Sequence, residues 1–330
     1  MTDRFPAMQH VILGRTGLRV GVAGLGCGGF SRLGLGTGGS EANAERVVRT
    51  ALDLGVNLLD TAAAYGTEDV VGRAIGGLPR EQVVLATKAH ANRREAPLPA
   101  ATVVASLHDS LRRLRTEYVD IFQLHGVPPA AYAHARDVIL PALLREREAG
   151  RIRHLGITET APGDPGHAML RQAVDDDAWD TVMVAFHMLH QNARTEVFPR
   201  TMGKRVGTLL MFVVRRIFAR PDLLVATMAE LAASGQLSQA VDPADPLGFL
   251  LHAGGAASVT EAAYRFVRHE PGVDVVLFGT GDPAHVRQNV ASLLAPPLPQ
   301  PDRERLAAMF GGLVGVGLDR PPPPRAGLKG

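Results

Sequence analysis

The stretch VVLATK at residues 83–88, followed by a helical pattern and then by YVDIFQLH at residues 118–125, is the clearest indication of the fold. Both runs are rich in apolar and β-branched residues, which favour strands. Between them, Val103, Leu107, Leu111 and Leu114 recur at intervals of four and three residues, the spacing of one helical face. Two apolar strands joined by a helix predict parallel strands whose outer face is covered.

The same alternation of strand and helix extends along the chain. β-rich runs occupy residues 20–25, 57–60, 83–88, 118–125, 154–158, 181–186, 208–214 and 273–279. Eight such units in 330 residues predict a closed (β/α)8 TIM barrel in place of an open sheet. Ahead of them, apolar residues on both sides of Gly14 and Gly17 predict a β-hairpin that precedes the barrel.

The domain organisation is predicted to be simple. No shift in composition divides the chain, so we expect a single barrel domain over residues 1–320. Residues 321–330 begin with four consecutive prolines and are predicted to form an extended, poorly ordered tail.

Composition narrows the class of protein. The 35 Lys and Arg residues nearly balance the 33 Asp and Glu residues, which argues against a nucleic-acid partner. Cys27 is the single cysteine, so an intrachain disulfide is excluded and no metal site is predicted. Neither an apolar signal core nor a membrane-length apolar run is present in the sequence, so we expect a cytoplasmic protein without a membrane partner.

Three polar residues stand at the ends of consecutive predicted strands. Asp60 ends the second run, Lys88 the third and His125 the fourth, and Tyr65 follows in the loop after the second. Taken singly, each has a structural explanation, such as a helix cap, a packed ring, a surface charge or a core histidine. Because the carboxyl ends of barrel strands face the active site, their coincidence there favours one shared catalytic site.

In order and spacing, these residues resemble the aldo-keto reductase family. The matching stretches are LGRTGL (13–18), GVNLLDTAAAYG (55–66), ATK (86–88), YVDIFQLH (118–125), GRIRHLGIT (150–158) and FGTG (278–281). The resemblance implies an NAD(P)H-dependent enzyme that reduces the carbonyl group of a small aldehyde or ketone, with NADPH or NADH as cofactor.

The resemblance also implies a role for each member of the tetrad. Tyr65 would be the general acid that protonates the carbonyl oxygen, and Lys88 would stabilise the phenolate left behind. Asp60 would pair with Lys88, because a buried ammonium is costly without a counterion. His125 would orient the substrate oxygen.

The cofactor is predicted to lie across the same end of the barrel. Gly279, Thr280 and Gly281 precede Asp282 and Pro283, a typical helix start at which the phosphates would bind. By resemblance, the adenosine half would contact Thr280, Gln288 and Asn289, with His285 near a 2′-phosphate, and Thr158 and Phe186 would flank the nicotinamide. Two arginines, Arg215 and Arg216, are either phosphate ligands or surface residues.

Some positions depart from the family pattern. Glu159 and Met183 stand where the family usually has amide side chains, which leaves the nicotinamide carboxamide without two expected hydrogen bonds. Two matches to the Rossmann glycine fingerprint lie between Gly24 and Gly39, but the next helix is predicted to start only after Ser40. We interpret this segment as a mobile loop at the catalytic mouth, with Phe30 and Arg32 as candidate contacts, or as a plain surface loop.

Two alternative functions stay open at this level. A nicotinamide-binding sensor or regulatory subunit would have the same fold, although it would not need the Tyr65 and Lys88 pair. An alcohol or sugar dehydrogenase would use the same residues in the oxidative direction.

Overall fold

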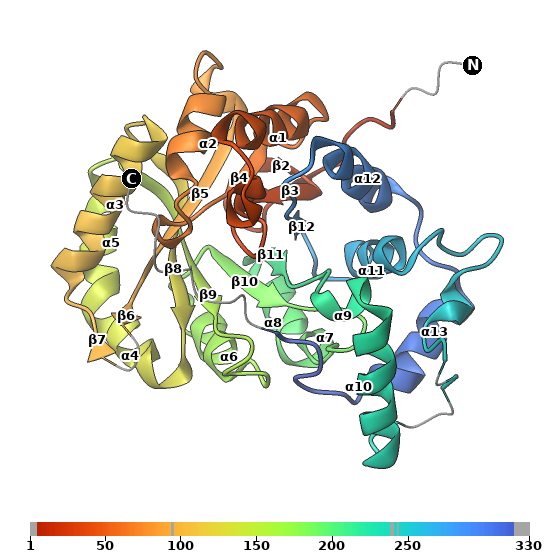
Figure 1. Cartoon of the computed structure of the whole chain (residues 1–330). Coiled ribbons are helices and arrows are strands. Elements are labelled where there is room, and N and C mark those ends of the chain that lie inside the picture. Colours follow the sequence, from red (N-terminus) through yellow and green to blue (C-terminus); the bar gives the residue numbers. More distant parts are fainter. Residues whose placement is uncertain (1–4, 94–95, 238–240, 243, 320–330) are drawn as a thin grey trace.

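The computed structural model describes residues 5–319 apart from 94–95, 238–240 and 243, and the predicted tail lies outside this range. Eight parallel strands close into a barrel in the order β3, β4, β5, β8, β9, β10, β11 and β12, and β12 pairs with β3 (Figure 1). This confirms the predicted (β/α)8 fold. The strands are β3 (Ala23–Gly26), β4 (Leu58–Asp60), β5 (Val84–His90), β8 (Val119–Val127), β9 (Ile152–Glu159), β10 (Thr181–Ala185), β11 (Gly207–Met211) and β12 (Val275–Phe278).

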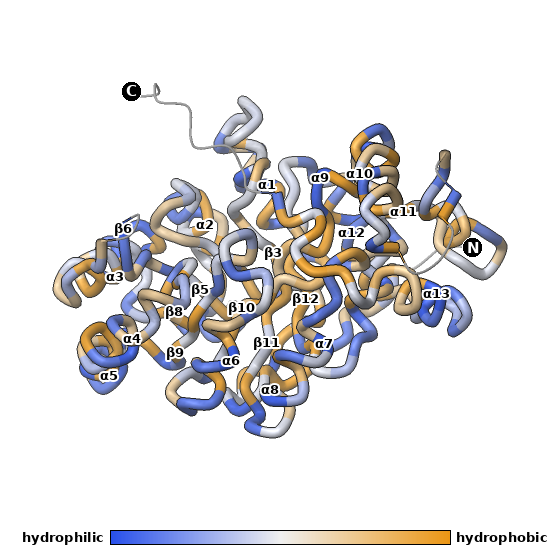
Figure 2. Tube along the Cα trace, turned by 90° about the horizontal axis from the view of Figure 1, so that it is seen from below, coloured by the Kyte–Doolittle hydropathy of each residue, from blue (hydrophilic) through white to orange (hydrophobic). Residues whose placement is uncertain are grey.

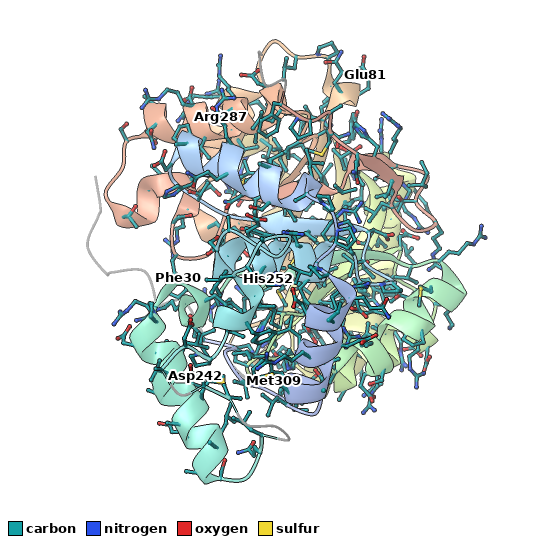
Figure 3. The ribbon with its side chains drawn as sticks, turned by 90° about the vertical axis from the view of Figure 1, so that its right-hand side faces the viewer. Phe30, Glu81, Asp242, His252, Arg287 and Met309 are labelled. Atoms are coloured by element: carbon teal, nitrogen blue, oxygen red, sulfur yellow. The ribbon has the colours of Figure 1, made fainter. Side chains whose placement is uncertain are left out.

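Helices surround the barrel, and α10 projects from its body in both side views (Figures 1 and 3). The α-helices are α1 (Glu41–Asp53), α2 (Glu68–Ala74), α3 (Ala100–Leu114), α4 (Tyr132–His134), α5 (Leu140–Glu148), α6 (Ala168–Asp175), α7 (Ala193–Glu196), α8 (Phe198–Lys204), α9 (Arg216–Ala219), α10 (Pro221–Ala233), α11 (Val259–Arg268), α12 (Pro283–Leu294) and α13 (Gln300–Phe310).

A β-hairpin precedes the barrel, as predicted. It pairs β1 (His10–Ile12) with β2 (Arg19–Gly21) in antiparallel register. The predicted first strand at residues 20–25 is wrong in its start, because Val20 belongs to the hairpin and the barrel strand begins only at Ala23. The physical reason is burial: Val20 and Leu13 are fully buried in the cluster inside the barrel, so the hairpin packs against the barrel interior. A second short antiparallel pair, β6 (Asn92–Arg93) and β7 (Ala96–Pro97), lies after β5.

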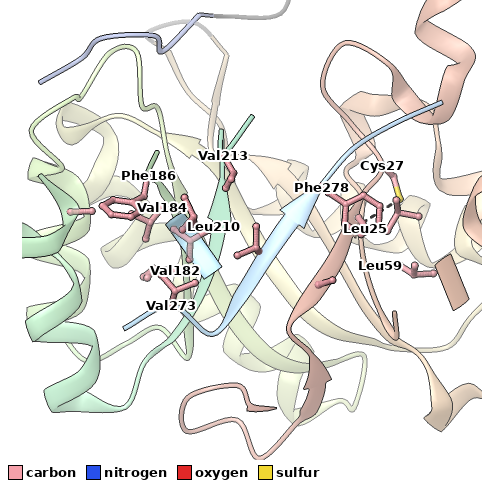
Figure 4. Packing of buried hydrophobic residues seen from close by; sticks show 14 of the residues in the cluster. Leu25, Cys27, Leu59, Val182, Val184, Phe186, Leu210, Val213, Val273 and Phe278 are labelled. Atoms are coloured by element: carbon pink, nitrogen blue, oxygen red, sulfur yellow. Dashed lines mark hydrogen bonds between the residues drawn. The ribbon is translucent and has the colours of Figure 1, made fainter. Parts of the chain in front are cut away.

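Two layers of apolar side chains stabilise the barrel. A small cluster that includes Leu58, Ile121 and Leu209 fills its interior, and a much larger one packs the strands against the helices (Figure 4). Hydrophobic residues accordingly concentrate along the central strands in Figure 2, and the hydrophilic ones lie mostly at the periphery. Such burial of continuous apolar strands on both faces is what a parallel barrel requires.

Capping side chains begin three helices, two of them at the predicted residues Ser40 and Asp282. Ser40 accepts a hydrogen bond from the Asn43 amide, Ser258 from the Glu261 amide and Asp282 from the Ala284 amide. The helix after the glycine-rich segment therefore starts where the sequence predicted. The segment itself contains a 3-10 helix (Arg32–Thr37) with Leu33 fully buried, so it packs on the barrel end.

Candidate active site

The tetrad residues are brought together at the carboxyl end of the barrel. Asp60 is the last residue of β4, Lys88 lies in β5 and His125 in β8, and these strands are neighbours in the sheet. Tyr65 ends a 3-10 turn (Ala63–Tyr65) directly after β4. The carboxyl ends of three consecutive parallel strands meet at one edge, which is why residues distant in sequence share one site.

Asp60 and Lys88 form a buried ion pair. The Lys88 Nζ donates to both carboxylate oxygens of Asp60 at 2.6 Å and to the Thr61 carbonyl oxygen at 2.9 Å. The Lys88 side chain is fully buried. Burial alone lowers the pKa of Lys88, but the negative charge of Asp60 and its hydrogen bonds raise it by more, so the net shift is upward and the ammonium stays charged.

Tyr65, which lines the pocket, forms a pair with His125. The Tyr65 hydroxyl lies 3.3 Å from His125 Nε2, and the two rings meet edge to face with centroids 5.4 Å apart. Lys88 Nζ lies 5.2 Å from the centre of the Tyr65 ring. Both Tyr65 and His125 are partly buried, and Tyr65 lines the pocket.

Burial and the Lys88 charge set the protonation states of this pair. Burial raises the pKa of Tyr65 above its ordinary value of 10.0, and the nearby Lys88 only partly offsets this rise. The phenol is therefore protonated at neutral pH. Burial, then Lys88 and then His90 lower the pKa of His125 well below 6.5, so its imidazole is neutral.

Three further residues shape the tetrad. The amide of Gln123 donates to Asp60 Oδ1 at 3.2 Å, and Gln123 lies opposite Lys88 in the β5–β8 register. A Cβ atom on Gly28 would lie 2.3 Å from the Tyr65 ring, so only glycine fits beside it. His90 stacks on the His125 ring. Sequence reasoning missed all three, although the period of two along each strand places Gln123 and His90 on the inner face.

Cys27 lies close to the tetrad but has no reactive character. It is fully buried, and its thiol contacts the Leu25 carbonyl oxygen at 3.7 Å (Figure 4). Burial raises its thiol pKa, and the Asp60 charge raises it further. The thiolate is the nucleophilic form, so a thiol held protonated is inert.

One pocket of about 1000 Å³ runs from the tetrad to the start of α12. Tyr65, Asp60 and Met183 lie at one end, and Gly279, Thr280, His285, Gln288 and Asn289 at the other. Phe30 and Arg215 also line it. Ligand pockets of this volume hold molecules of cofactor size.

Six of the ten residues predicted to bind the cofactor line this pocket, and four do not. Phe186 is fully buried on the helix side of β10, where it packs against Phe198 and Phe266 (Figure 4). The structure therefore does not bring it to the place of a stacking ring. Phe212, which the prediction missed, lines the pocket instead.

The other three residues also lie off the pocket lining. Thr158 is buried, and its hydroxyl accepts a hydrogen bond from the Gly126 amide at 2.6 Å. Arg216 is exposed at the start of α9. Gly281 packs against the backbone of Gly34, where a Cβ atom would lie 2.4 Å from the Gly34 Cα.

Arg215 is not a simple surface residue, because its side chain is buried and already paired. Its side chain is 7% exposed, and its Nε donates to Asp319 Oδ1 at 3.1 Å. The guanidinium also lies over the rings of Phe212, at 4.0 Å, and Phe30, at 5.4 Å. Arg215 thus joins three segments across the pocket: the loop after β3, the loop after β11 and the C-terminal segment. In Figure 3, Phe30 appears near the end of α10 that joins the body.

Two departures from the family pattern have structural explanations. The Glu159 carboxylate accepts hydrogen bonds from the Ala185 amide at 2.7 Å and from His167 Nδ1, also at 2.7 Å. It therefore ties β9 to β10 and does not line the pocket. Met183 does line the pocket, where its thioether offers an apolar contact.

Among the described residues, no three His, Cys, Asp or Glu side chains come together as a metal site. None of the helices within residues 5–319 is long and apolar enough to cross a bilayer.

Comparison with known proteins identifies similar chains. The model of the aldo/keto reductase family matches residues 24–309. An aldo-keto reductase of Bacillus subtilis, YhdN, is 28% identical over 296 residues, which cover 78% of this chain and 83% of the relative. L-Galactose dehydrogenase of Arabidopsis thaliana is 34% identical over 152 residues, covering 44% and 47% of the two chains.

Solved structures share the fold. The holo form of aldo-keto reductase AKR11C1 from Bacillus halodurans superposes with a TM-score of 0.71, at 24% identity, and covers 94% of this chain and 100% of its own. An aldo-keto reductase from Klebsiella pneumoniae, solved in complex with NADP and acetate, has a TM-score of 0.63 at 22% identity, with coverages of 92% and 96%.

Proposed function

The chain belongs to the aldo/keto reductase family, and from this premise we propose that it reduces an aldehyde or ketone with NADPH or NADH, with Tyr65 as proton donor. The observation that carries the proposal is the Tyr65 hydroxyl, 3.3 Å from His125 Nε2 at the pocket floor beside the Lys88–Asp60 pair. A phenol, a neutral imidazole and a buried cation at one point suit the transfer of a proton to a carbonyl oxygen.

Tyr65 supplies the proton in this proposal. A bound reduced nicotinamide would deliver a hydride to the carbonyl carbon, and the proton from the Tyr65 hydroxyl goes to the carbonyl oxygen. Since burial raises the pKa of Tyr65, the phenol is in the form that donates. The Lys88 charge then stabilises the phenolate until solvent returns a proton.

His125 and Asp60 complete the assignment. The neutral His125 has its Nε2 beside the Tyr65 hydroxyl, so that nitrogen can orient the substrate oxygen at the same point. Asp60 keeps Lys88 charged and fixes its position with two hydrogen bonds of 2.6 Å.

The pocket has features that suit a dinucleotide. It is long enough to join the tetrad to the N-terminal end of α12, and backbone N–H groups at such an end favour phosphate. Thr280, Gln288 and Asn289 would hold the adenosine half, with His285 beside them. Arg215 would lie over the phosphates. The NADP-containing relative from Klebsiella pneumoniae supports this choice of cofactor.

A second candidate is the same chemistry in the oxidative direction. The similarity to L-galactose dehydrogenase favours it, because that relative is named as a dehydrogenase of a sugar. Tyr65 would then act as the base and Lys88 would again stabilise its phenolate.

The test follows nicotinamide absorbance in both directions. NADPH or NADH is mixed with aldehydes and ketones, and NADP⁺ or NAD⁺ with alcohols and sugars. We expect the variant Tyr65→Phe to lose about 10²- to 10⁴-fold in kcat on the best substrate, the usual contribution of general acid–base catalysis. Its affinity for the cofactor should not change.

A matched control is the variant Tyr118→Phe. Tyr118 lies directly before β8, at the opposite end of the barrel, and its ring is stacked between Arg80 and Arg153. Full activity of the Tyr65→Phe variant would contradict the proton-donor assignment. Tight cofactor binding without turnover of any substrate would favour a sensor.

A further inference from the structure

A second histidine lies against the tetrad. His90, the last residue of β5, is opposite His125 in the parallel register of β5 and β8. The two imidazole rings are stacked with centroids 4.5 Å apart and planes 7° from parallel. His90 Nδ1 lies 3.1 Å from the His125 carbonyl oxygen and is the donor, because a carbonyl oxygen can only accept.

The His125 ring has few other restraints. Its Nε2 contacts the Tyr65 hydroxyl, and its Nδ1 is buried without a hydrogen-bond partner among the described residues. In many catalytic histidines, a hydrogen bond to the second nitrogen fixes the ring and its tautomer. Here, no such bond is present in the described chain, and the face of the ring is covered by His90 instead.

We propose that His90 is a positioning residue, which holds the His125 imidazole in place by stacking while its own Nδ1 is anchored on the His125 carbonyl oxygen. The inference rests on the proposed function, because it assigns His90 to the orientation of His125 toward the carbonyl oxygen. His90 is exposed, and neither it nor His125 is among the residues that line the pocket, so the role of His90 rests on its contact with His125.

The geometry explains why a ring is needed at this position. The hydrogen bond to the main chain of β8 sets where His90 lies, and the parallel planes then limit how far the His125 ring can tilt. The Tyr65 ring meets His125 edge to face, with 89° between the ring planes, and is a second contact that limits the movement of the His125 ring. An aromatic side chain at residue 90 would keep the stack, and alanine would remove it.

The experiment compares His90→Ala with His90→Phe. Loss of a stacked aromatic pair should lower kcat about tenfold in the His90→Ala variant, with unchanged KM for the cofactor. His90→Phe should recover most of kcat, because it keeps the ring and loses only the anchoring hydrogen bond. Equal kcat in wild type and His90→Ala would overturn the proposal.

A double-variant cycle separates positioning from direct contact with substrate. Adding His90→Ala to a His125→Ala variant should cause no further loss, since the residue to be positioned is absent. A further tenfold loss would overturn the proposal and assign His90 to the substrate. His134→Ala is the control: it also removes a histidine-to-carbonyl bond, from His134 Nε2 to the Leu98 oxygen, but outside the pocket.

An NMR measurement makes the test independent of turnover. The ¹⁵N chemical shifts of the His125 ring report its tautomer and surroundings in the full chain without any substrate. In His90→Ala, we expect these resonances to shift and broaden, and in His134→Ala to stay as in wild type. If no carbonyl compound is reduced but the NMR changes are seen, the proposed function fails and the positioning contact stands. Unchanged His125 resonances in His90→Ala would overturn the inference itself.

Discussion

The two ends of the pocket are built in different ways. At the tetrad end, Asp60, Lys88 and His125 belong to adjacent strands, and their positions follow from the register of the barrel. At the other end, the pocket is covered by loops, and Arg215 is held by Asp319, 104 residues away in sequence. A strand end is fixed by backbone hydrogen bonds on both sides, whereas the position of Arg215 depends on side-chain contacts with separate segments.

This difference predicts how substitutions in each half should affect stability and activity. In the tetrad half, Lys88 and Asp60 are buried and paired, so the loss of one leaves the charge of the other buried and unpaired. In the loop half, Arg215 contacts a partly exposed carboxylate and two rings, and each of these contacts is individually modest. Variants in the two halves should therefore differ in stability as well as in activity.

The largest effect is expected for Lys88→Met. Removing the ammonium leaves the Asp60 carboxylate buried without its partner, so the free energy of unfolding should fall by about 3–5 kcal/mol. Reduction should be lost together with the cation that stabilises the phenolate. Chemical denaturation and turnover measured on the same preparation check both effects.

The double variant Lys88→Met/Asp60→Asn is the control for this prediction. It removes both charges, so most of the lost stability should return while activity stays absent. If the double variant is as unstable as Lys88→Met, the buried charge of Asp60 is not the cause.

A smaller effect is expected for Arg215→Ala in the loop half. If Arg215 covers the cofactor phosphates, as proposed, its removal should weaken the binding of NADPH about tenfold, the value of one charge-assisted hydrogen bond. Stability should change much less than in Lys88→Met. Fluorescence titration with NADPH measures the affinity, and thermal unfolding the stability.

The variant Asp319→Asn separates a phosphate contact of Arg215 from its contact with the C-terminal segment. It keeps the Arg215 side chain but weakens the hold of the C-terminal segment on it. Affinity for NADPH should then stay the same or increase. An equal loss of affinity in both variants would mean that Arg215 acts only by holding the C-terminal segment.

The difference between strand ends and loops also explains how much could be predicted from the sequence. The barrel and the tetrad follow from apolar periodicity and from polar residues at strand ends, and Ser40, Ser258 and Asp282 mark helix starts by local chemistry. Phe186 was placed by resemblance, but it stands three residues after Met183, which lines the pocket, so the period of two puts its ring on the outer face with Phe198 and Phe266. No local pattern announces the Arg215–Asp319 contact, because it depends on the path of two loops.

The smallest expected effect is the pH dependence of stability that comes from a contact of the C-terminal segment. His190 Nδ1 accepts a hydrogen bond from the Gly315 amide at 3.1 Å, and this bond ties the C-terminal segment to the loop after β10. A protonated imidazole cannot accept that bond. Burial, with the nearby His167 charge, lowers the pKa of His190 from 6.5 to about 3. The unfolded chain therefore binds this proton near pH 6.5 and the folded chain only far below it.

The sign of the effect follows from this difference in proton binding. The contribution of His190 to stability is complete above pH 6.5 and declines as the pH falls, by at most about 1.4 kcal/mol per pH unit. In His190→Asn, the amide oxygen can accept from Gly315 without titrating, so stability should fall less steeply between pH 6.5 and pH 5. Buried His187 has the same sign and remains in the variant, so the decline becomes shallower and does not vanish. Parallel stability curves for wild type and His190→Asn would contradict the assignment of this acid response to His190.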